Sequence, residues 1–290
     1  MAEPEDNVEV QSQADMWELI FAFGDFMVLK CSMKLGIPDI VNKHGSPITI
    51  SQIAEKISTS PSFQINYLFR IMRFLVRKRV ITSEYKDGDT FYSLTHTGKW
   101  LLPDAEFTLA PLLELETHEW LLDAWNHLDK CVLEGGDGLQ KAHGTGLWDF
   151  VSGNPEYNKI FNGAMACTAK IVVNAILSNY NGFNGVRSLI DVGGGTGMMI
   201  GEIVKAHPHI AGINFDQTHV LATAPEYPGV VHVPGDMFVQ IPQADAVIMK
   251  IFEFPMSPPA PPPVRLPIDH QNFDDGFGSN SDSSSETLLA

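Results

Sequence analysis

A short glycine-rich stretch, Asp191 to Gly197, holds the residues whose types and spacing suggest chemistry most directly. It reads Asp-Val-Gly-Gly-Gly-Thr-Gly, and a turn almost without side chains lets the backbone approach a ligand and adopt positive φ angles. Residues 188–192 have the look of a buried strand, and residues 198–206 carry apolar side chains at a helical period. Strand, glycine turn and helix together predict a nucleotide-binding unit, in which the free N–H groups of the helix N-terminus face the ligand.

The spacing of these glycines argues against two common ligands. A dinucleotide fingerprint, G-x-G-x-x-G, would place a glycine at position 198, where the chain has Met198. A phosphate-binding loop would need Gly-Lys-Ser/Thr, and no lysine follows the turn. At this point a turn that serves only as a hinge remains an alternative.

Two carboxylates and a lysine follow at the expected ends of later strands. The further strands that we expect are residues 213–216, 230–233 and 244–249. Asp216 ends the first of them, near the offset at which such folds hold a ribose diol. Asp236 and Met237 follow the second, where a carboxylate and a soft apolar side chain suit an adenine, and Lys250 follows the third. Alternating strands and helices predict a parallel sheet with its ligand at the carboxyl ends of the strands.

These segments resemble a known family. Asp191 to Gly197 has the D-x-G-x-G-x-G pattern of S-adenosylmethionine methyltransferases, and from about Trp17 to Lys250 the chain resembles the plant small-molecule O-methyltransferases. That family methylates phenolic hydroxyls of phenylpropanoids, flavonoids and alkaloids. The other matching segments are residues 212–216, 219–229, 235–238 and 246–250. The resemblance implies S-adenosyl-L-methionine as the cofactor, and it implies these contacts: Gly193, Asp216, Asp236, Met237 and Lys250.

Composition bounds the function further. At 290 residues the chain is long enough for two domains with cores. Its net charge of −16 argues against binding nucleic acid or an anionic membrane through a basic surface. Cys31, Cys131 and Cys167 lie far apart, which indicates reduced thiols in a cytoplasmic protein, and no histidine or cysteine spacing suggests a metal site. The acidic start of the chain has neither the basic region nor the apolar core of a leader peptide, and we find no membrane span.

The N-terminal part predicts a mainly α winged-helix domain over residues 15–105, after a disordered segment 1–14. Dense apolar residues in 15–35 predict a helix buried against a partner, which we expect to be a second subunit. Residues 49–57 predict a first helix, Ser60-Pro61 the start of a second, and residues 80–82 and 91–94 a hairpin. In the family resembled, this module dimerises the protein, so we expect a homodimer or a heterodimer with related methyltransferases.

A winged helix raises DNA binding as a rival function, because basic residues follow the helix that would enter a groove. They are Arg70, Arg73, Arg77, Lys78 and Arg79. The hairpin, however, carries Asp87 and Asp89 where phosphates would lie, and the protein as a whole repels polyanions. We therefore favour the interpretation of these bases as a solvated helix face.

Residues 106–180 should be mostly helical and hold the acceptor substrate. Glu114 to Leu133 predicts one long helix that stops at Glu134, and another helix should open at Pro155. Aromatic and Met residues at helical spacing are, one by one, more often core than ligand-binding. The family resemblance nevertheless implies an acceptor pocket for a phenolic small molecule, lined by Trp125, Asn126, Tyr157, Phe161, Met165 and Thr168.

The resemblance stops after Lys250. The family places its general-base histidine four positions beyond this lysine, and here position 254 is Phe254, so we assign no catalytic residue. Residues 251–290 are rich in Pro and Ser and predict a disordered tail, which suggests a C-terminally truncated or frame-altered form. Without a positioned base, transfer to a phenol should be slow.

The fold that we expect is therefore α/β: a Rossmann-like methyltransferase domain with an incomplete parallel sheet over residues 181–250, preceded by the winged helix. Its strand ending at Lys250 should be an exposed edge. The main functional hypothesis is an S-adenosylmethionine-dependent O-methyltransferase of plant phenols, and the alternative is a non-catalytic partner that dimerises with full-length relatives.

Overall fold

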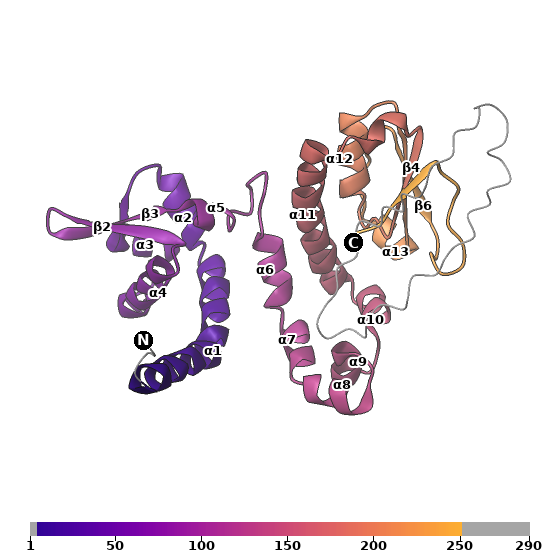
Figure 1. The fold of residues 1–290 in the computed structure, drawn as a ribbon. Coiled ribbons are helices and arrows are strands. Elements are labelled where there is room, and N and C mark those ends of the chain that lie inside the picture. Colours follow the sequence, from indigo (N-terminus) through magenta and orange to yellow (C-terminus); the bar gives the residue numbers. More distant parts are fainter. Residues whose placement is uncertain (1–4, 251–290) are drawn as a thin grey trace, which may run out of the picture.

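The structure of the protein is a computed structural model that describes residues 5–250. Figure 1 shows three parts in chain order: an N-terminal group of helices with a small sheet, a middle group of short helices, and a second sheet flanked by helices. The predicted tail, residues 251–290 with Phe254, lies outside the described residues.

The N-terminal part has the expected winged-helix elements. Its helices are α1 (Glu5–Lys34), α2 (Ile37–His44), α3 (Ile50–Ile57), α4 (Ile65–Arg77) and α5 (His96–Lys99). Its antiparallel sheet has the order β1-β3-β2, built from β1 (Ile48–Thr49), β2 (Ile81–Lys86) and β3 (Asp89–Leu94). The hairpin turns at Asp87 and Gly88, both with positive φ (53° and 87°), which suits the twist of the two strands. The sequence predicted this hairpin with shorter strands and missed β1.

Two predicted boundaries in this part are wrong. Residues 5–14, expected to be disordered, continue α1, because no Gly or Pro interrupts the helix before Gly24. The second helix begins at Ile65 rather than at Ser60-Pro61. The Ser60 hydroxyl lies 2.8 Å from that of Ser62 and accepts from its N–H, so the serine side chains stabilise a local turn that competes with helix.

The middle part consists of short helices packed around aromatic residues. They are α6 (Ala110–Glu116), α7 (Glu119–Trp125), α8 (Leu128–Glu134), α9 (Gly138–His143) and α10 (Leu147–Gly153). The prediction of a single helix from Glu114 to Leu133 is wrong, because the helix is interrupted at Thr117 and His118. The Thr117 hydroxyl donates to the carbonyl of Leu113 at 2.6 Å, and the His118 ring caps α7 by accepting from the N–H of Trp120. The expected stop at Glu134 is confirmed, and Gly135 follows it with φ 71°.

Helix α11 (Pro155–Asn179) begins at the expected proline and connects the middle part to the second sheet. It packs against α6 and α10 on one side and against α12 on the other. Of the helices in residues 5–250, this one is long and apolar enough to cross a membrane by length and composition alone. In the structure it packs against α6, α10 and α12, and 28% of its apolar window is buried.

The second sheet is parallel, as predicted, with the order β6-β5-β4-β7. Its strands are β4 (Ser188–Val192), β5 (Ala211–Asp216), β6 (Val230–Pro234) and β7 (Ala246–Ile248). A 3-10 turn η1 (Gly182–Gly185) precedes it, and α12 (Met198–Ala206) and α13 (Thr218–Leu221) connect its strands. Ile200 and Ile203 of α12 pack, fully buried, against Leu189 and Val173, so α11 and α12 share one core with the sheet.

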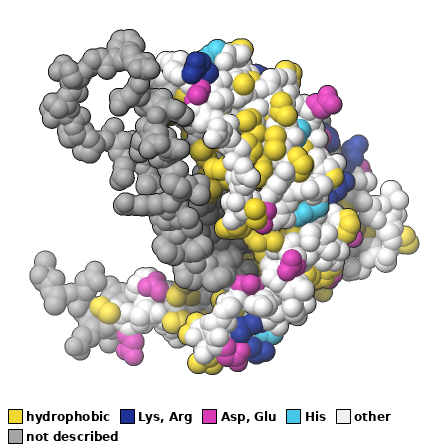
Figure 2. All heavy atoms as spheres, turned by 90° about the vertical axis from the view of Figure 1, so that its right-hand side faces the viewer, with side chains coloured by type: hydrophobic (Ala, Val, Ile, Leu, Met, Phe, Trp, Pro, Cys, Tyr) yellow, Lys and Arg dark blue, Asp and Glu magenta, His cyan; other side chains and the backbone are white. Residues whose placement is uncertain are grey.

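Strand β7 is an edge of the sheet within the described residues, as expected. Val247 is 53% exposed and Met249 is 44% exposed. Figure 2 views the molecule from the side of this sheet and shows hydrophobic side chains gathered in the middle of that face. Val231, Phe238 and Val239 are further exposed apolar residues of this part of the chain.

The start of α3 yields a stability prediction. The Thr49 side chain accepts from the N–H of Gln52, and the Gln52 side chain accepts from the N–H of Thr49, which together form a capping box. We expect Thr49→Ala to lower the free energy of unfolding by about 1 kcal/mol, because one backbone donor loses its partner. Thr49→Ser keeps the hydroxyl and is the control. Urea unfolding followed by circular dichroism measures both, and equal midpoints for Thr49→Ala and the wild type would contradict the capping role.

Candidate functional site

The five residues expected to hold the cofactor lie at one edge of the parallel sheet. Gly193 directly follows β4, Asp216 ends β5, Asp236 and Met237 follow β6, and Lys250 follows β7. The strands are parallel and in register, so their carboxyl ends lie side by side. This edge is where open α/β sheets bind their ligands.

The glycine turn has the backbone that its sequence predicts. Gly193, Gly195 and Gly197 adopt φ angles of 67°, 60° and 86°, a region that strains any residue with a Cβ. Gly197 is the N-cap of α12, so the first N–H groups of this helix border the turn. Gly194 has no such φ angle, but a Cβ there would lie 2.2 Å from Asn214 Oδ1. Each of these glycines is therefore required by geometry.

Asp216 ties the turn to the neighbouring strand. Its Oδ2 accepts a 2.7 Å hydrogen bond from the N–H of Gly195, and its Oδ1 accepts one of the same length from Gln217. Burial raises the pKa of this carboxyl, while the two N–H donors and His219 oppose that shift. A carboxylate has about four lone-pair positions, so two remain for a ligand diol.

Met237 and Asp236 meet the turn from the end of β6. The methyl carbon of Met237 lies 3.3 Å from the point where a Cβ on Gly193 would stand, so a side chain on Gly193 would press on this thioether. Met237 is 37% exposed, and Asp236 is exposed too. Asp236 Oδ1 accepts from the N–H of Phe238 at 2.9 Å, which fixes the carboxylate in a local turn. The structure thus brings Gly193 and Met237 into contact and places Asp236 beside them.

Lys250 connects this edge to helix α11. Its ammonium donates to the Thr168 hydroxyl at 3.4 Å, and it lies near Asp191 and Cys167. Burial lowers the pKa of Lys250, and the negative charge of Asp191 opposes the shift. Thr168 was expected to line the acceptor pocket, so this contact joins one residue of each expected set.

The other expected acceptor residues are spread over two regions. Trp125 and Asn126 lie at the C-terminal end of α7, which packs against α9 and α6. Figure 1 shows α7 well separated from the strands. Tyr157, Phe161 and Met165 belong to α11, and they pack in the core of the middle part. Thr168, which is also on α11, bonds Lys250 at the edge of the sheet.

Tyr157 is a core residue in this structure. Its side chain is 0% exposed and contacts the rings of His118, Trp120 and Phe150. Burial raises the pKa of its hydroxyl, and Glu116 adds to the shift. Phe161 is nearly as buried, at 7% exposed. For these two aromatic residues, the geometry favours a role in packing over a role in binding the acceptor. The sequence had left both interpretations open.

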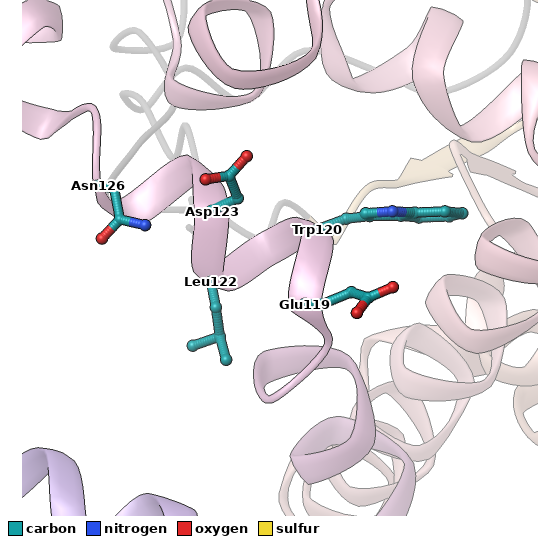
Figure 3. Close-up of a pocket in the computed structure, with 5 residues that line it drawn as sticks. All are labelled: Glu119, Trp120, Leu122, Asp123 and Asn126. Carbon is teal, nitrogen blue, oxygen red and sulfur yellow. The ribbon is translucent and has the colours of Figure 1, made fainter.

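An open pocket of about 430 Å³ lies along α7. Figure 3 shows its five lining residues, with Trp120 and Glu119 pointing one way and Leu122 and Asp123 pointing to opposite sides of the helix. Asn126, expected to bind the acceptor, is among them. The pocket does not include the carboxyl edge of the sheet.

Sequence reasoning missed a polar network beneath the turn. Asn214 Nδ2 donates to the carbonyl of Gly195 at 3.0 Å and lies 3.0 Å from His232 Nδ1. His232 Nε2 in turn lies 2.9 Å from the carbonyl of Pro225. Asp191 borders this network and is 2% exposed. The signal available in the sequence was Asn214, a polar residue between apolar residues of an expected strand. Residues 5–250 hold no group of three or more His, Cys, Asp or Glu placed to bind a metal ion.

Family models and known proteins match the chain over most of its length. Residues 17–104 match the O-methyltransferase dimerisation domain, and residues 125–255 match the O-methyltransferase domain. (R,S)-reticuline 7-O-methyltransferase of Papaver somniferum is 53% identical over 248 residues, which cover 83% of this chain and 70% of the relative. Xanthohumol 4-O-methyltransferase of Humulus lupulus is 50% identical over 252 residues, 83% of this chain and 69% of the relative.

Solved structures show the same fold. Human N-acetylserotonin methyltransferase in complex with SAM matches with a TM-score of 0.74 at 19% identity, covering 86% of this chain and 72% of that one. LaPhzM matches with a TM-score of 0.67 at 27% identity, covering 81% of this chain and 70% of that one.

The crowding at Gly194 yields a prediction. We expect Gly194→Ala to lower the free energy of unfolding by about 1–3 kcal/mol, because the new Cβ overlaps Asn214 Oδ1 and Asp191 Oδ2 and forces the turn to move. The matched control is Gly185→Ala, where a Cβ meets nothing within 4 Å. Chemical unfolding of both variants gives the comparison. If Gly194→Ala unfolded at the same midpoint as the control, the close approach would be wrong.

Proposed function

The chain belongs to the S-adenosylmethionine-dependent O-methyltransferases, and on that premise we propose that the carboxyl edge of its sheet holds S-adenosyl-L-methionine while α11 presents a phenolic hydroxyl to it. The observation that carries the proposal is the convergence of the glycine turn, two carboxylates and Lys250 at one edge. The contact of Lys250 with Thr168 then joins this edge to the helix expected to line the acceptor.

The residues present fit a sulfonium nucleoside. Asp216 has lone pairs left for a ribose diol after its bonds to Gly195 and Gln217. Met237 offers an exposed thioether over Gly193, suited to the flat face of an adenine, and Asp236 lies next to it. Three consecutive glycines, residues 193–195, leave this part of the turn without side chains that would block the approach. S-adenosyl-L-methionine supplies an electrophilic methyl group when bound.

The acceptor in this proposal is a phenolic plant secondary metabolite. The two relatives above are named for reticuline and xanthohumol, and the chain shares half or more of its aligned residues with each. Thr168 contacts the methyl-transfer edge through its bond to Lys250. Met165, one helical turn earlier, would contact the ring, while Tyr157 and Phe161 support the helix from the core. Trp125 and Asn126 would contact only a long acceptor that reaches α7.

Proton removal sets the rate in this proposal. An unperturbed phenol has a pKa of about 10, so little phenolate is present at neutral pH. The position at which the family has its histidine is Phe254, outside the described residues, and phenylalanine accepts no proton. A positioned base contributes about 10²–10⁴-fold to such a reaction. Without one, the acceptor must ionise in water before it is methylated.

We further propose that the protein acts as a dimer in the cytoplasm, either with itself or with a related methyltransferase. The part of α1 before Gly24 has large apolar side chains that are more than half exposed. They include Met16, Trp17, Leu19, Ile20, Phe21 and Phe23. The three cysteines are free thiols, which suits a reducing compartment.

A methyl-transfer assay with labelled S-adenosylmethionine and a panel of phenols tests the activity. We expect transfer whose rate rises tenfold per pH unit from about pH 7 to 9, because the phenolate concentration rises so. A rate that levels off near neutral pH would show a base that we have not identified. No transfer from a folded, cofactor-binding protein would favour the non-catalytic partner.

The Asp216→Asn variant tests the proposed cofactor site through its affinity for S-adenosylmethionine. An asparagine cannot accept from both Gly195 and Gln217, because its amide nitrogen would face one of the two N–H groups. We expect the dissociation constant for S-adenosylmethionine in calorimetry to rise about 10- to 100-fold, as loss of a charged hydrogen-bond partner costs about 1.5–3 kcal/mol. Asp104→Asn, at an exposed position, is the control. Equal affinities for the two variants would refute the assigned role.

The dimer is tested by Trp17→Glu. Trp17 is 55% exposed and stacks on Phe21, with 5.4 Å between the ring centroids. A charge at this position should weaken association at least about tenfold, because the carboxylate would lose its water in the interface. Light scattering should then show a monomer at micromolar concentration. Val132→Glu changes an 85% exposed residue of α8 in the same way and should leave the dimer intact. A dimer that survives Trp17→Glu would place the interface elsewhere.

A further inference from the structure

Two buried oxygen atoms lie close to the same point beneath the glycine turn. Asp191 Oδ2 and Asn214 Oδ1 have no hydrogen-bond partner among the residues that the structure describes. Asp191 is 2% exposed and Asn214 is 0% exposed. The two residues are direct neighbours in the register of β4 and β5. A Cβ on Gly194 would lie 2.2 Å from the asparagine oxygen and 2.8 Å from the aspartate oxygen, so both atoms converge on one point.

The orientation of the Asn214 amide follows from its other contacts. Its Nδ2 lies 3.0 Å from the carbonyl oxygen of Gly195, an atom that can only accept. The nitrogen must therefore be on that side, and the oxygen is the amide atom near Gly194, where Asp191 Oδ2 also lies. His232 fits the same direction, because its Nε2 lies against the carbonyl of Pro225 and must carry the proton. Nδ1 of this ring is then the acceptor for Asn214.

A donor is missing at the start of this chain of hydrogen bonds. Each later member donates to the next: Asn214 to Gly195 and His232, and His232 to Pro225. Asn214 Oδ1, however, lies in the same buried space as a carboxyl oxygen, and two buried acceptors without a proton between them repel each other in a low-dielectric interior. One proton on Asp191 would satisfy both atoms.

We propose that Asp191 is a neutral carboxylic acid in the folded protein and that its O–H donates to Asn214 Oδ1. Asp191 is then a positioning residue: it orients the asparagine amide, which holds the carbonyl of Gly195 and so the shape of the cofactor turn. In this proposal, a carboxylic acid and an amide, both buried, share one hydrogen bond.

The charged groups around Asp191 agree with this assignment. Burial and the nearby Asp216 at the end of β5 raise the pKa of Asp191 to about 7, and Lys250 after β7 opposes the shift. From α12, the backbone N–H of Ile200 donates to Asp191, and this hydrogen bond also opposes the rise of the pKa. His232 of β6 is hydrogen-bonded to Asn214, the strand neighbour of Asp191. Because the folded pKa exceeds the unfolded value, the stabilisation is complete at acidic pH and is lost as pH rises through about 7.

The experiment compares Asp191→Asn with the wild type in chemical unfolding of the whole chain from pH 5.5 to 8.5. The asparagine carries an N–H donor that does not titrate. We expect the unfolding equilibrium constant of the wild type to rise relative to that of Asp191→Asn by on the order of 30-fold over this range, which follows from a pKa of about 7. The variant should therefore be the more stable protein at pH 8.5. Asp104→Asn, which removes an exposed carboxylate, should follow the wild type throughout.

The result that would overturn the proposal is an Asp191→Asn protein that is less stable than the wild type at pH 8.5, that fails to fold there, or whose stability runs parallel to the wild type. Any of these would mean that Asp191 is an ionised acceptor. The stability measurement does not depend on the proposed methyl transfer.

A second measurement rests on the proposed function and uses S-adenosylhomocysteine, whose sulfur is uncharged. At pH 8.5, Asp191→Asn should bind it at least as tightly as the wild type, and Asp191→Ala, which has no donor, should bind it at least about tenfold more weakly. Equal binding by both variants would overturn the positioning role. If the wild type bound none of it while the pH profiles differed as expected, the cofactor assignment would fail and the buried acid would stand.

Discussion

The candidate site depends on the attachment of the glycine turn to strand β5. Three consecutive residues of β5 bond to the turn: Asn214 donates to the carbonyl of Gly195, the carbonyl of Phe215 accepts from Gly193, and Asp216 accepts from the N–H of Gly195. Because both the N–H and the carbonyl of Gly195 are held, the turn cannot rotate freely about its glycines. Backbone that is flexible by composition thus becomes rigid through its neighbour, as a preorganised binding site requires.

The parts of the fold that the sequence predicted best are those with local signals. Helix α12 has the predicted bounds, because the glycine turn ends at Gly197 and the apolar period continues to Ala206. The four parallel strands were found from short apolar runs, and a polar residue at the end of each run placed the candidate ligand contacts. Gly193 and Asp216 could be placed at one edge because parallel strands bring their carboxyl ends together. Their roles toward a cofactor remain a proposal.

The parts that the sequence could not predict depend on hydrogen bonds between side chain and backbone. The break between α6 and α7 is set by the hydroxyl of Thr117 and the ring of His118, and the apolar period runs across both. The late start of α4 depends on serine hydroxyls that bond each other. The partners of Asn214 lie 18 and 19 residues away, at His232 and Gly195, so only the folded chain shows them. Patterns of hydrophobicity carry no information about such pairs.

Helix α11 links the two halves of the proposed reaction. It packs against α12, whose N-terminus borders the glycine turn, and against α6 of the middle part. Thr168 on this helix bonds Lys250 at the end of β7, so the helix touches the cofactor edge through a side chain as well as through packing. Any shift of α11 would move Thr168 and the start of α12 together. In the proposed reaction, the distance between an acceptor on α11 and a methyl group at the sheet edge would therefore depend on the packing of α11 against α12.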